Sequence, residues 1–219
     1  MKYKGVIFDL DGTLVNTLYD LKNSCNYVMR KNGFPEHSYE NIRSFIGNGI
    51  HKLIERACPM GTDSKIVEKC FNEMVAHYNE NNCVESCTFD GIDKLLADLK
   101  SNGIKLAVLT NKIQSSTDKV VDYYLHDIFS IVQGDDGKLP LKPNTDGIDM
   151  IINSWSMKKN EVLYVGDSCV DTKTARNAGV DCVACKWGFC DSEVLVNEHT
   201  RYIVDNPSQI YDIVMGENL

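Results

Sequence analysis

Two aspartates at the end of a short apolar segment are the first residues of this chain whose spacing indicates chemistry. Val6, Ile7 and Phe8 are typical of a buried strand, and they are followed directly by Asp-Leu-Asp-Gly-Thr at residues 9–13. Two anions beside an apolar strand repel each other and lose hydration, so a divalent cation with oxygen ligands is the simplest group to hold between them. The alternative is a polar turn that only ends the strand, because short turns rich in Asp are common.

Four more polar residues stand at the ends of predicted strands or in a loop. Thr110, Asn111 and Asp167 follow predicted strands, and Lys142 lies in a loop. With Asp9 and Asp11 they supply three carboxylates, a hydroxyl, an amide and a lysine, the set needed to bring a dianionic phosphate to a carboxylate nucleophile. Mg²⁺ would then bridge Asp9 and the phosphate, with Asp167 as its second carboxylate ligand. Thr110 and Lys142 would hold the phosphate oxygens that are not transferred.

An alternation of helices and strands that begins near residue 89 would position these residues. Apolar segments short enough for buried strands occur at residues 104–109, 129–132 and 162–165, and segments with helical spacing separate them. This alternation predicts an α/β fold, a doubly wound, mostly parallel (Rossmann-like) sheet covered by helices on both faces. Because the carboxyl ends of parallel strands share one edge of the sheet, the polar residues that follow them can meet in one crevice.

The segment between the first strand and this alternation is helical. Apolar residues recur at helical spacing from Leu18 to Tyr78, with interruptions at Gly33 and Pro59. We therefore predict a small helical bundle inserted after one strand.

Four short motifs occur in order over essentially the whole chain. They are Asp-Leu-Asp-Gly-Thr at 9–13, Thr-Asn-Lys at 110–112, Lys-Pro at 142–143, and Gly-Asp-Ser at 166–168 with Asp171, Ala175, Ala178 and Gly179. In this order the motifs resemble the haloacid dehalogenase superfamily, in its phosphatase branch with a helical cap after the first strand. The resemblance implies an α/β core domain of residues 1–15 and 86–219 and a helical cap domain of residues 16–85.

The resemblance also implies a role for each charged residue. Asp9 is expected to be the nucleophile that forms an aspartyl-phosphate, and Asp11 the acid that protonates the leaving oxygen and then the base that activates water. Asp9, the backbone carbonyl of Asp11, and Asp167 are expected to bind Mg²⁺. Asp171 is expected to assist the metal through a water or to orient Lys142. Because the dehalogenases of the superfamily lack an acid at position 11, its presence argues against that reaction.

Within this branch the chain is most similar to phosphoglycolate phosphatases and their relatives. Residues 43–50 of the cap and residues 186–189 of the core carry this similarity. Three positions depart from the common pattern, since Asn16, Ile113 and Asn144 stand where Asp, Pro and Pro are frequent. None of them is part of the expected chemistry, so the departures bear on the substrate rather than on the reaction.

Several residues near the motifs have two interpretations. Arg43 either contacts a substrate carboxylate or is solvated. Asn48 and Gly49 either bind a substrate anion at the start of the following helix or only begin that helix. Lys112 either orients the loop next to Asn111 or faces solvent, and we expect it to face solvent. Lys186 either reaches the crevice or is solvated.

The nine cysteines are predicted to be reduced, because their number is odd and most of them sit singly in ordinary helix or strand patterns. Cys182 and Cys185, with Cys190 nearby, resemble half of a zinc or redox motif. Residues three apart on a strand face opposite sides of the sheet, and no second pair follows, so we do not expect a metal there.

Composition excludes several classes of partner. A formal net charge of −8 over 219 residues argues against a general binder of nucleic acid or of anionic membranes. No apolar run approaches the roughly 20 residues that cross a bilayer, and residues 1–5 show no signal-peptide pattern. We expect a cytoplasmic monomer or homodimer that acts on a small phosphorylated metabolite.

These observations predict a Mg²⁺-dependent phosphatase whose cap closes over the site, excludes bulk water and selects the leaving group. The alternatives within the superfamily are a phosphoryl-transferring mutase of the β-phosphoglucomutase type, a pyrophosphatase or a nucleotidase. A regulatory protein with a vestigial site belongs to a different class. Retention of Asp9, Asp11, Lys142 and Asp167 argues against it.

Overall fold

Six parallel strands form the central sheet of the computed structural model, which describes residues 1–191, 195 and 200–216. Their order across the sheet is β5-β4-β1-β6-β7-β8. The strands are β1 (Gly5–Phe8), β4 (Lys105–Ile113), β5 (Ile131–Asp135), β6 (Val162–Gly166), β7 (Asp181–Cys185) and β8 (Tyr202–Val204). The predicted α/β fold with a parallel sheet is confirmed.

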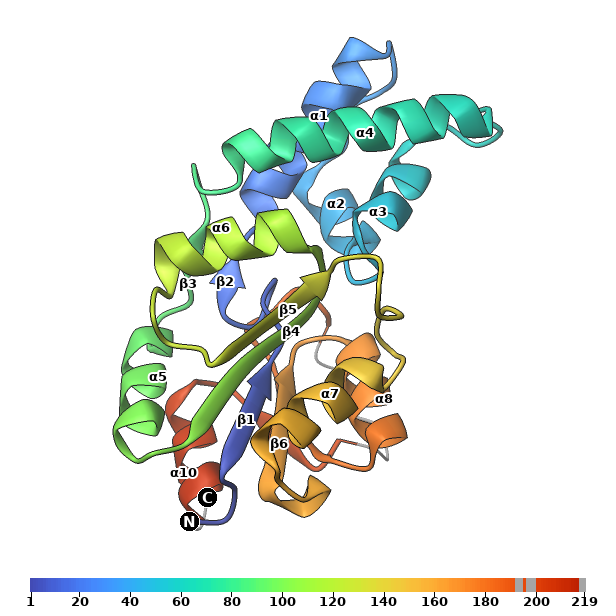
Figure 1. Ribbon diagram of the computed structural model, residues 1–219. Helices are drawn as coiled ribbons and strands as arrows, with labels where there is room; N and C mark the ends of the chain where they lie inside the picture. The colour runs from blue at the N-terminus through green and yellow to red at the C-terminus, as the bar shows by residue number, and fades with distance from the viewer. Residues whose placement is uncertain (192–194, 196–199, 217–219) are drawn as a thin grey trace.

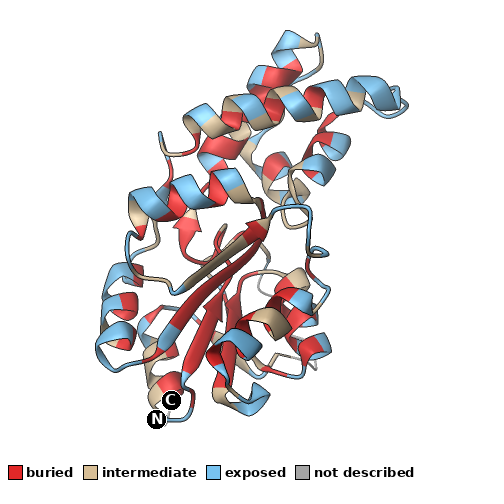
Figure 2. Ribbon diagram, viewed as in Figure 1, coloured by how far each residue is buried: buried red, intermediate tan, exposed pale blue. Residues whose placement is uncertain are grey.

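Helices cover both faces of the sheet, as the alternation of side chains along β1 requires. Val6 and Phe8 face one layer, and Ile7 faces the other. The first layer is formed by α5 (Ile92–Ser101), α6 (Gln114–Tyr124) and α10 (Ser208–Met215), and the second by α7 (Asp146–Trp155) and α8 (Cys169–Ala178). Because β1 is buried on both faces, it is apolar throughout, and Figure 2 shows the central strands as the most buried part of the molecule.

Four helices form a separate layer beyond the end of the sheet to which the strand arrows point (Figure 1). They are α1 (Leu18–Lys31), α2 (Tyr39–Phe45), α3 (Ile50–Ala57) and α4 (Ser64–Asn81). Their apolar residues make a hydrophobic cluster of their own, to which the core contributes Phe189 and Phe89. We call these four helices the cap.

Two chain crossings connect the cap to the rest of the molecule. The short strands β2 (Val15–Asn16) and β3 (Cys87–Thr88) pair antiparallel at this point. On the cap side, the buried carboxylate of Asp20 accepts hydrogen bonds from the backbone N–H groups of residues 84–86 at 2.9–3.1 Å. We propose that the β2–β3 pair marks the boundary between core and cap, close to the division predicted from the sequence.

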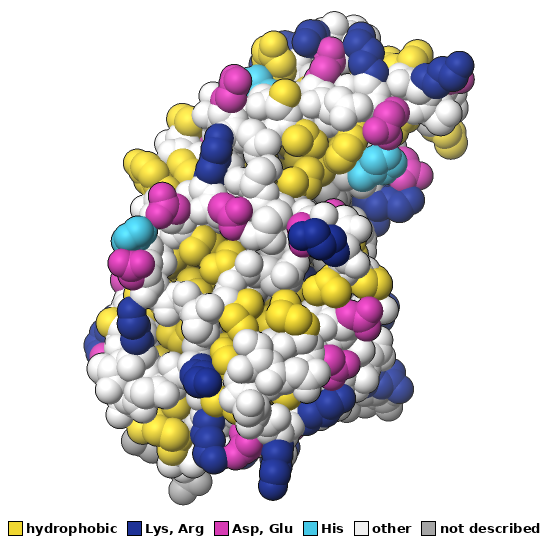
Figure 3. Space-filling view, viewed as in Figure 1, with side chains coloured by type: hydrophobic (Ala, Val, Ile, Leu, Met, Phe, Trp, Pro, Cys, Tyr) yellow, Lys and Arg dark blue, Asp and Glu magenta, His cyan; other side chains and the backbone are white. Residues whose placement is uncertain are grey.

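The outer surface carries mixed charge. On the face shown in Figure 3, Lys and Arg side chains alternate with Asp and Glu. Among the described residues, no helix is long and apolar enough to cross a membrane. Asp9, Lys142 and Asp167 by contrast are buried, beneath the cap.

Candidate active site

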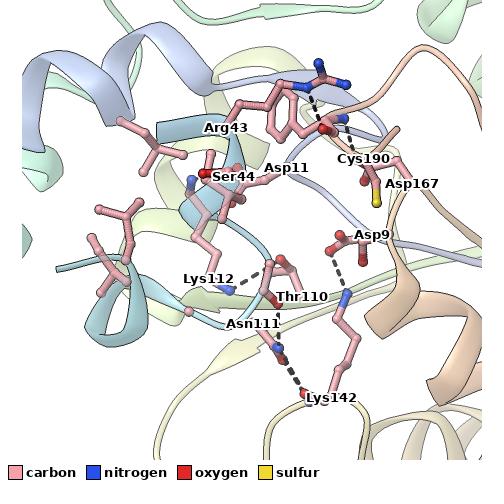
Figure 4. Close-up of a pocket in the computed structure, with 18 of the residues that line it drawn as sticks. Asp9, Asp11, Arg43, Ser44, Thr110, Asn111, Lys112, Lys142, Asp167 and Cys190 are labelled. Carbon is pink, nitrogen blue, oxygen red and sulfur yellow. Dashed lines mark hydrogen bonds and ion pairs between the residues drawn. The ribbon is translucent and has the colours of Figure 1, made fainter. Parts of the chain in front are cut away.

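The polar residues that follow the strands meet in one cavity of about 250 Å³ between the sheet and the cap. Asp9 stands directly after β1, Thr110 and Asn111 lie on β4, and Asp167 follows β6. Lys142 comes from the loop between β5 and α7. Figure 4 shows these side chains converging from different elements on one space. The parallel sheet therefore brings together residues that are up to 158 positions apart, from Asp9 to Asp167.

Lys142 lies at the centre of a buried group of carboxylates. Its Nζ is 2.8 Å from Asp9 Oδ1 and 2.7 Å from Asp171 Oδ1, and it donates to the hydroxyl of Tyr164 at 3.1 Å. Burial by itself would lower the pKa of this lysine, but the charges of Asp171 and Asp9 raise it well above its ordinary value. Lys142 is therefore a permanent cation beside Asp9.

The carboxylates outnumber the cation. Asp9, Asp167 and Asp171 carry three negative charges when ionised and Lys142 one positive charge, which leaves an excess of two. Burial raises the pKa of Asp9 to about 6, although the charge of Lys142 lowers it, and burial raises the pKa of Asp167 well above its ordinary value. Desolvation and mutual repulsion thus both disfavour the ionised cluster in the protein alone.

This group of residues fits a divalent metal ion. Oxygen atoms of Asp9, Asp167 and Asp171 lie within 4.8 Å of one another. Asp9 Oδ1 is buried beside Lys142 but not at a hydrogen-bonding angle, so no described residue donates a hydrogen bond to it. A hard cation with oxygen ligands would offset the excess charge and satisfy this oxygen.

One side-chain hydroxyl and one backbone N–H hold the carboxylate of Asp167 in place. Oδ1 accepts a hydrogen bond from Thr13 Oγ1 at 2.9 Å, and Oδ2 accepts one from the N–H of Phe189 at 2.7 Å. A Cβ atom at Gly12 would lie 2.3 Å from Asp167 Oδ2, and one at Gly188 would lie 2.2 Å from Asp167 Cβ. Both positions therefore require glycine for this carboxylate to fit.

Asp171 orients Lys142 from the first turn of α8. Ser168 caps this helix, and Asp171 Oδ2 accepts from the Ser168 N–H at 3.0 Å and from its hydroxyl at 2.6 Å. Asp171 Oδ1 accepts from Lys142 and from Tyr164. Because both oxygens are bonded to donors, the geometry favours the orienting role over the water-mediated one.

Asn111 ties the loop of Lys142 to strand β4. Its Oδ1 accepts from the backbone N–H of Lys142 at 2.8 Å, and its Nδ2 donates to the backbone carbonyl of Lys142 at 3.1 Å. The same Nδ2 lies 3.3 Å from the carbonyl of Gly47 in the cap. The amide of Asn111 thus positions Lys142, and both Asn111 and the buried Thr110 line the cavity.

The prediction that Lys112 faces solvent is wrong. Its side chain is only 4% exposed, and Nζ donates to Asp11 Oδ1 at 2.8 Å and to the hydroxyl of Tyr78 at 2.6 Å. Strand β4 continues to Ile113, but its register against β5 shifts between Leu109 and Ile113. Thr110 and Lys112 both line the cavity. Because this irregularity interrupts the regular alternation of side chains, no local pattern placed Lys112 in the site.

The cap residues predicted as candidates have clear partners. Arg43 donates to the carbonyl of Phe189 at 2.5 Å and to Asp191 Oδ1 at 2.9 Å, so it joins the cap to a core loop at the rim of the cavity. Asn48 Oδ1 accepts from Arg56 at 2.8 Å. Gly49 lines the cavity and precedes α3 with a φ of 82°.

Lys186 and the pair of Cys182 and Cys185, each with two interpretations in the sequence, lie outside the site. Lys186 pairs with Asp205 at 2.9 Å on the surface and does not reach the cavity. Cys182 and Cys185 are buried in the layers on opposite faces of the sheet, so they do not form a shared metal site. Two tyrosines that contact the site lysines, Tyr78 and Tyr164, were missed because a tyrosine within an apolar pattern is typical of core packing.

A parallel sheet with a buried cluster of aspartates around one lysine, under a helical cap, defines a capped α/β enzyme with a carboxylate-rich centre. Residues 6–185 match the family model of the haloacid dehalogenase-like hydrolases. The chain belongs to this family.

Relatives and a solved structure of similar sequence cover most or all of this chain. Phosphoglycolate phosphatase of Thiobacillus denitrificans is 31% identical over 191 residues, covering 85% of this chain and 84% of the relative. That of Haemophilus influenzae is 30% identical over 224 residues, covering 97% and 99%. A solved structure from Lactobacillus delbrueckii subsp. bulgaricus has a TM-score of 0.92 at 27% identity and covers 99% of this chain and 100% of that one.

Proposed function

We propose that this protein is a Mg²⁺-dependent phosphatase that hydrolyses a small phosphate monoester through an aspartyl-phosphate, with phosphoglycolate as the first substrate to test. The observation that carries the proposal is the position of Lys142 beside Asp9, in a buried cluster with excess negative charge that opens on the cavity. The activity in the names of the relatives supports the same reaction.

The phosphate end of the substrate would lie against Asp9, Thr110 and Lys142. Lys142 and the Thr110 hydroxyl would hold the oxygens that are not transferred and stabilise the negative charge of the transition state. Asp9, the backbone carbonyl of Asp11, and Asp167 would hold Mg²⁺, which supplies charge neutralisation and polarises the phosphate when bound. Asp171 would keep Lys142 in place.

The reaction then proceeds in two displacements. In the first, an Asp9 oxygen forms a bond to phosphorus, the bond to the leaving oxygen breaks, and Asp11 gives its proton to that oxygen. In the second, Asp11 takes a proton from a water molecule whose oxygen attacks the same phosphorus. The bond to Asp9 breaks, and inorganic phosphate leaves.

The leaving group would occupy the cap side of the cavity. That side is lined by Leu21, Ile46, Ile50, Leu53 and Phe189, with Arg43 and Ser44 at its polar edge. A closed cap would exclude bulk water from the aspartyl-phosphate.

We place the reaction in the cytoplasm, because no disulfide joins the cysteines of the described residues.

The test is Mg²⁺-dependent phosphate release from phosphoglycolate, sugar phosphates, nucleotides and pyrophosphate. We expect release from a small monoester, lost on chelation and lowered at least about 1,000-fold in Asp9→Asn. Asp93→Asn, on the exposed side of α5, is the control and should keep full activity. Isomerisation of a sugar phosphate without net phosphate release would identify a mutase instead, and turnover of the metal-bound Asp9→Asn protein at the parent rate would exclude Asp9 as the nucleophile.

A further inference from the structure

A second buried lysine stands on the leaving-group side of the cavity, and the reaction described above does not use it. Lys112 Nζ lies between Asp11 of the core and Tyr78 of the cap, 2.8 Å from Asp11 Oδ1 and 2.6 Å from the Tyr78 hydroxyl. It also lies 4.6 Å from the centroid of the Tyr78 ring. Tyr78 is 1% exposed and the Lys112 side chain 4%, so the contact between these two residues is buried.

The bonds to Asp11 are all on one of its two oxygens. Oδ1 accepts from Lys112 and also from Thr17 Oγ1, at 2.7 Å. Within the described part of the chain, no donor is bound to Oδ2. Since Asp11 lines the cavity, two fixed donors on one oxygen leave the other available to the space where the leaving group would lie.

We infer that Lys112 and Tyr78 are positioning residues that hold Asp11 by Oδ1, so that Oδ2 is the oxygen that passes its proton to the leaving group and later takes one from water. The inference rests on the proposed function, because it assigns these residues a part in its two displacements. Tyr78 holds the lysine, and the lysine holds the aspartate. The cap thus contributes to the acid and base without touching the reacting atoms.

A purely structural role for the same contacts would also stabilise the docking of α4 on the core. The two roles differ in what the leaving group requires. An alkoxide such as glycolate needs the proton of Asp11 in order to leave, whereas p-nitrophenolate is a weak base and leaves without it. The second displacement needs Asp11 for either substrate. Disturbing the orientation of Asp11 should therefore spare only the first displacement of p-nitrophenyl phosphate.

The test compares Lys112→Met and Tyr78→Phe with the parent on phosphoglycolate and p-nitrophenyl phosphate, by steady-state and rapid-mixing kinetics. Lys112→Met keeps the length of the side chain, and Tyr78→Phe keeps the buried ring. The controls are Lys105→Met, exposed on the same strand β4, and Tyr123→Phe, exposed on α6. Melting temperatures are recorded for every variant.

We expect kcat for phosphoglycolate to fall about 100-fold in Lys112→Met and about 10-fold in Tyr78→Phe, with KM changed less than about 3-fold. The first turnover of p-nitrophenyl phosphate should remain within about 3-fold of the parent and appear as a burst before a slow steady state. Both controls should match the parent.

An equal loss of the nitrophenol burst and of phosphoglycolate turnover in Tyr78→Phe would overturn the inference, and so would unchanged kinetics in both variants. If Lys112→Met does not fold, the result for Tyr78→Phe alone tests the inference. If the parent protein releases no phosphate from either substrate, the proposed function is wrong and this inference falls with it. If the parent is active and the variants show an equal loss or no change, only the inference is wrong.

Discussion

The two buried lysines of the cavity stand in different electrostatic surroundings. Lys142 shares a cluster of three carboxylates that belongs entirely to the core, whereas Lys112 faces the single carboxylate of Asp11 and a tyrosine from the cap. The first group has an excess of negative charge, and the second is balanced. One side of the cavity is therefore formed by the core alone and has an excess of negative charge, which a cation would offset. The other side is complete only when the cap is docked.

The largest test of this contrast removes the cation from the crowded side. Lys142→Met would leave Asp9 and Asp171 buried beside each other without the cation that offsets their charge, and the phosphate without a cation. We expect kcat/KM to fall more than about 1,000-fold and the nitrophenol burst, which Lys112→Met should keep, to disappear. The measurement is rapid-mixing kinetics on both variants side by side. A burst of parent size in Lys142→Met would show that the two lysines do not differ in the way proposed.

A second test uses pH on the metal-free protein. Asp9 has a folded pKa raised to about 6, so between about pH 4 and 6 the folded protein binds more protons than the unfolded chain. Its contribution therefore destabilises the fold as pH rises through this window. We expect the melting temperature to fall by about 3 °C more in the parent than in Asp9→Asn between pH 5 and 7.

Mg²⁺ should reverse this loss. Because it binds the ionised carboxylates, it should raise the melting temperature of the parent more at pH 7 than at pH 5. Calorimetry of both proteins, with and without the metal, gives the comparison. Identical pH dependence in the parent and Asp9→Asn would contradict the charge excess around Lys142. The Lys112→Met variant should keep the response to Mg²⁺, since its side of the cavity is balanced.

The smallest effect is expected at the second donor to Asp11. Thr17→Val removes the hydroxyl bonded to Oδ1 and leaves Lys112 to hold the same oxygen alone. We expect kcat for phosphoglycolate to fall about 3-fold, near the low end of the net contribution of one hydrogen bond, because Lys112 still holds the same oxygen. Steady-state kinetics measures it, with Thr62→Val in the cap, a half-buried threonine that does not line the cavity, as the control. A loss equal to that of Lys112→Met would mean that the hydroxyl, and not the lysine, orients Asp11.

The sequence was sufficient for the fold and for the strand-end residues, but not for the contacts across the cavity. Periodicity identifies strands such as β1 and β6, and parallel strands bring Asp9 and Asp167 to one edge without further information. Tyr78 belongs to the apolar stripe of α4, and only the docking of that helix turns its hydroxyl toward Lys112. Arg43 reaches a loop 146 residues away, which no local pattern encodes.

Phe189 gives this site one more property. Its N–H is bonded to Asp167 and its carbonyl to Arg43 of the cap, so a single residue touches both the carboxylate cluster and the cap. Where cation binding at Asp167 and substrate binding under the cap are coupled through this residue, each changes the affinity of the other by the same free energy. If a cation drawn to Asp167 tightens the hold of the cap, then a substrate that keeps the cap down tightens the hold on the cation by an equal factor. Substrate affinity and metal affinity would therefore be measured correctly only with the concentration of the other stated.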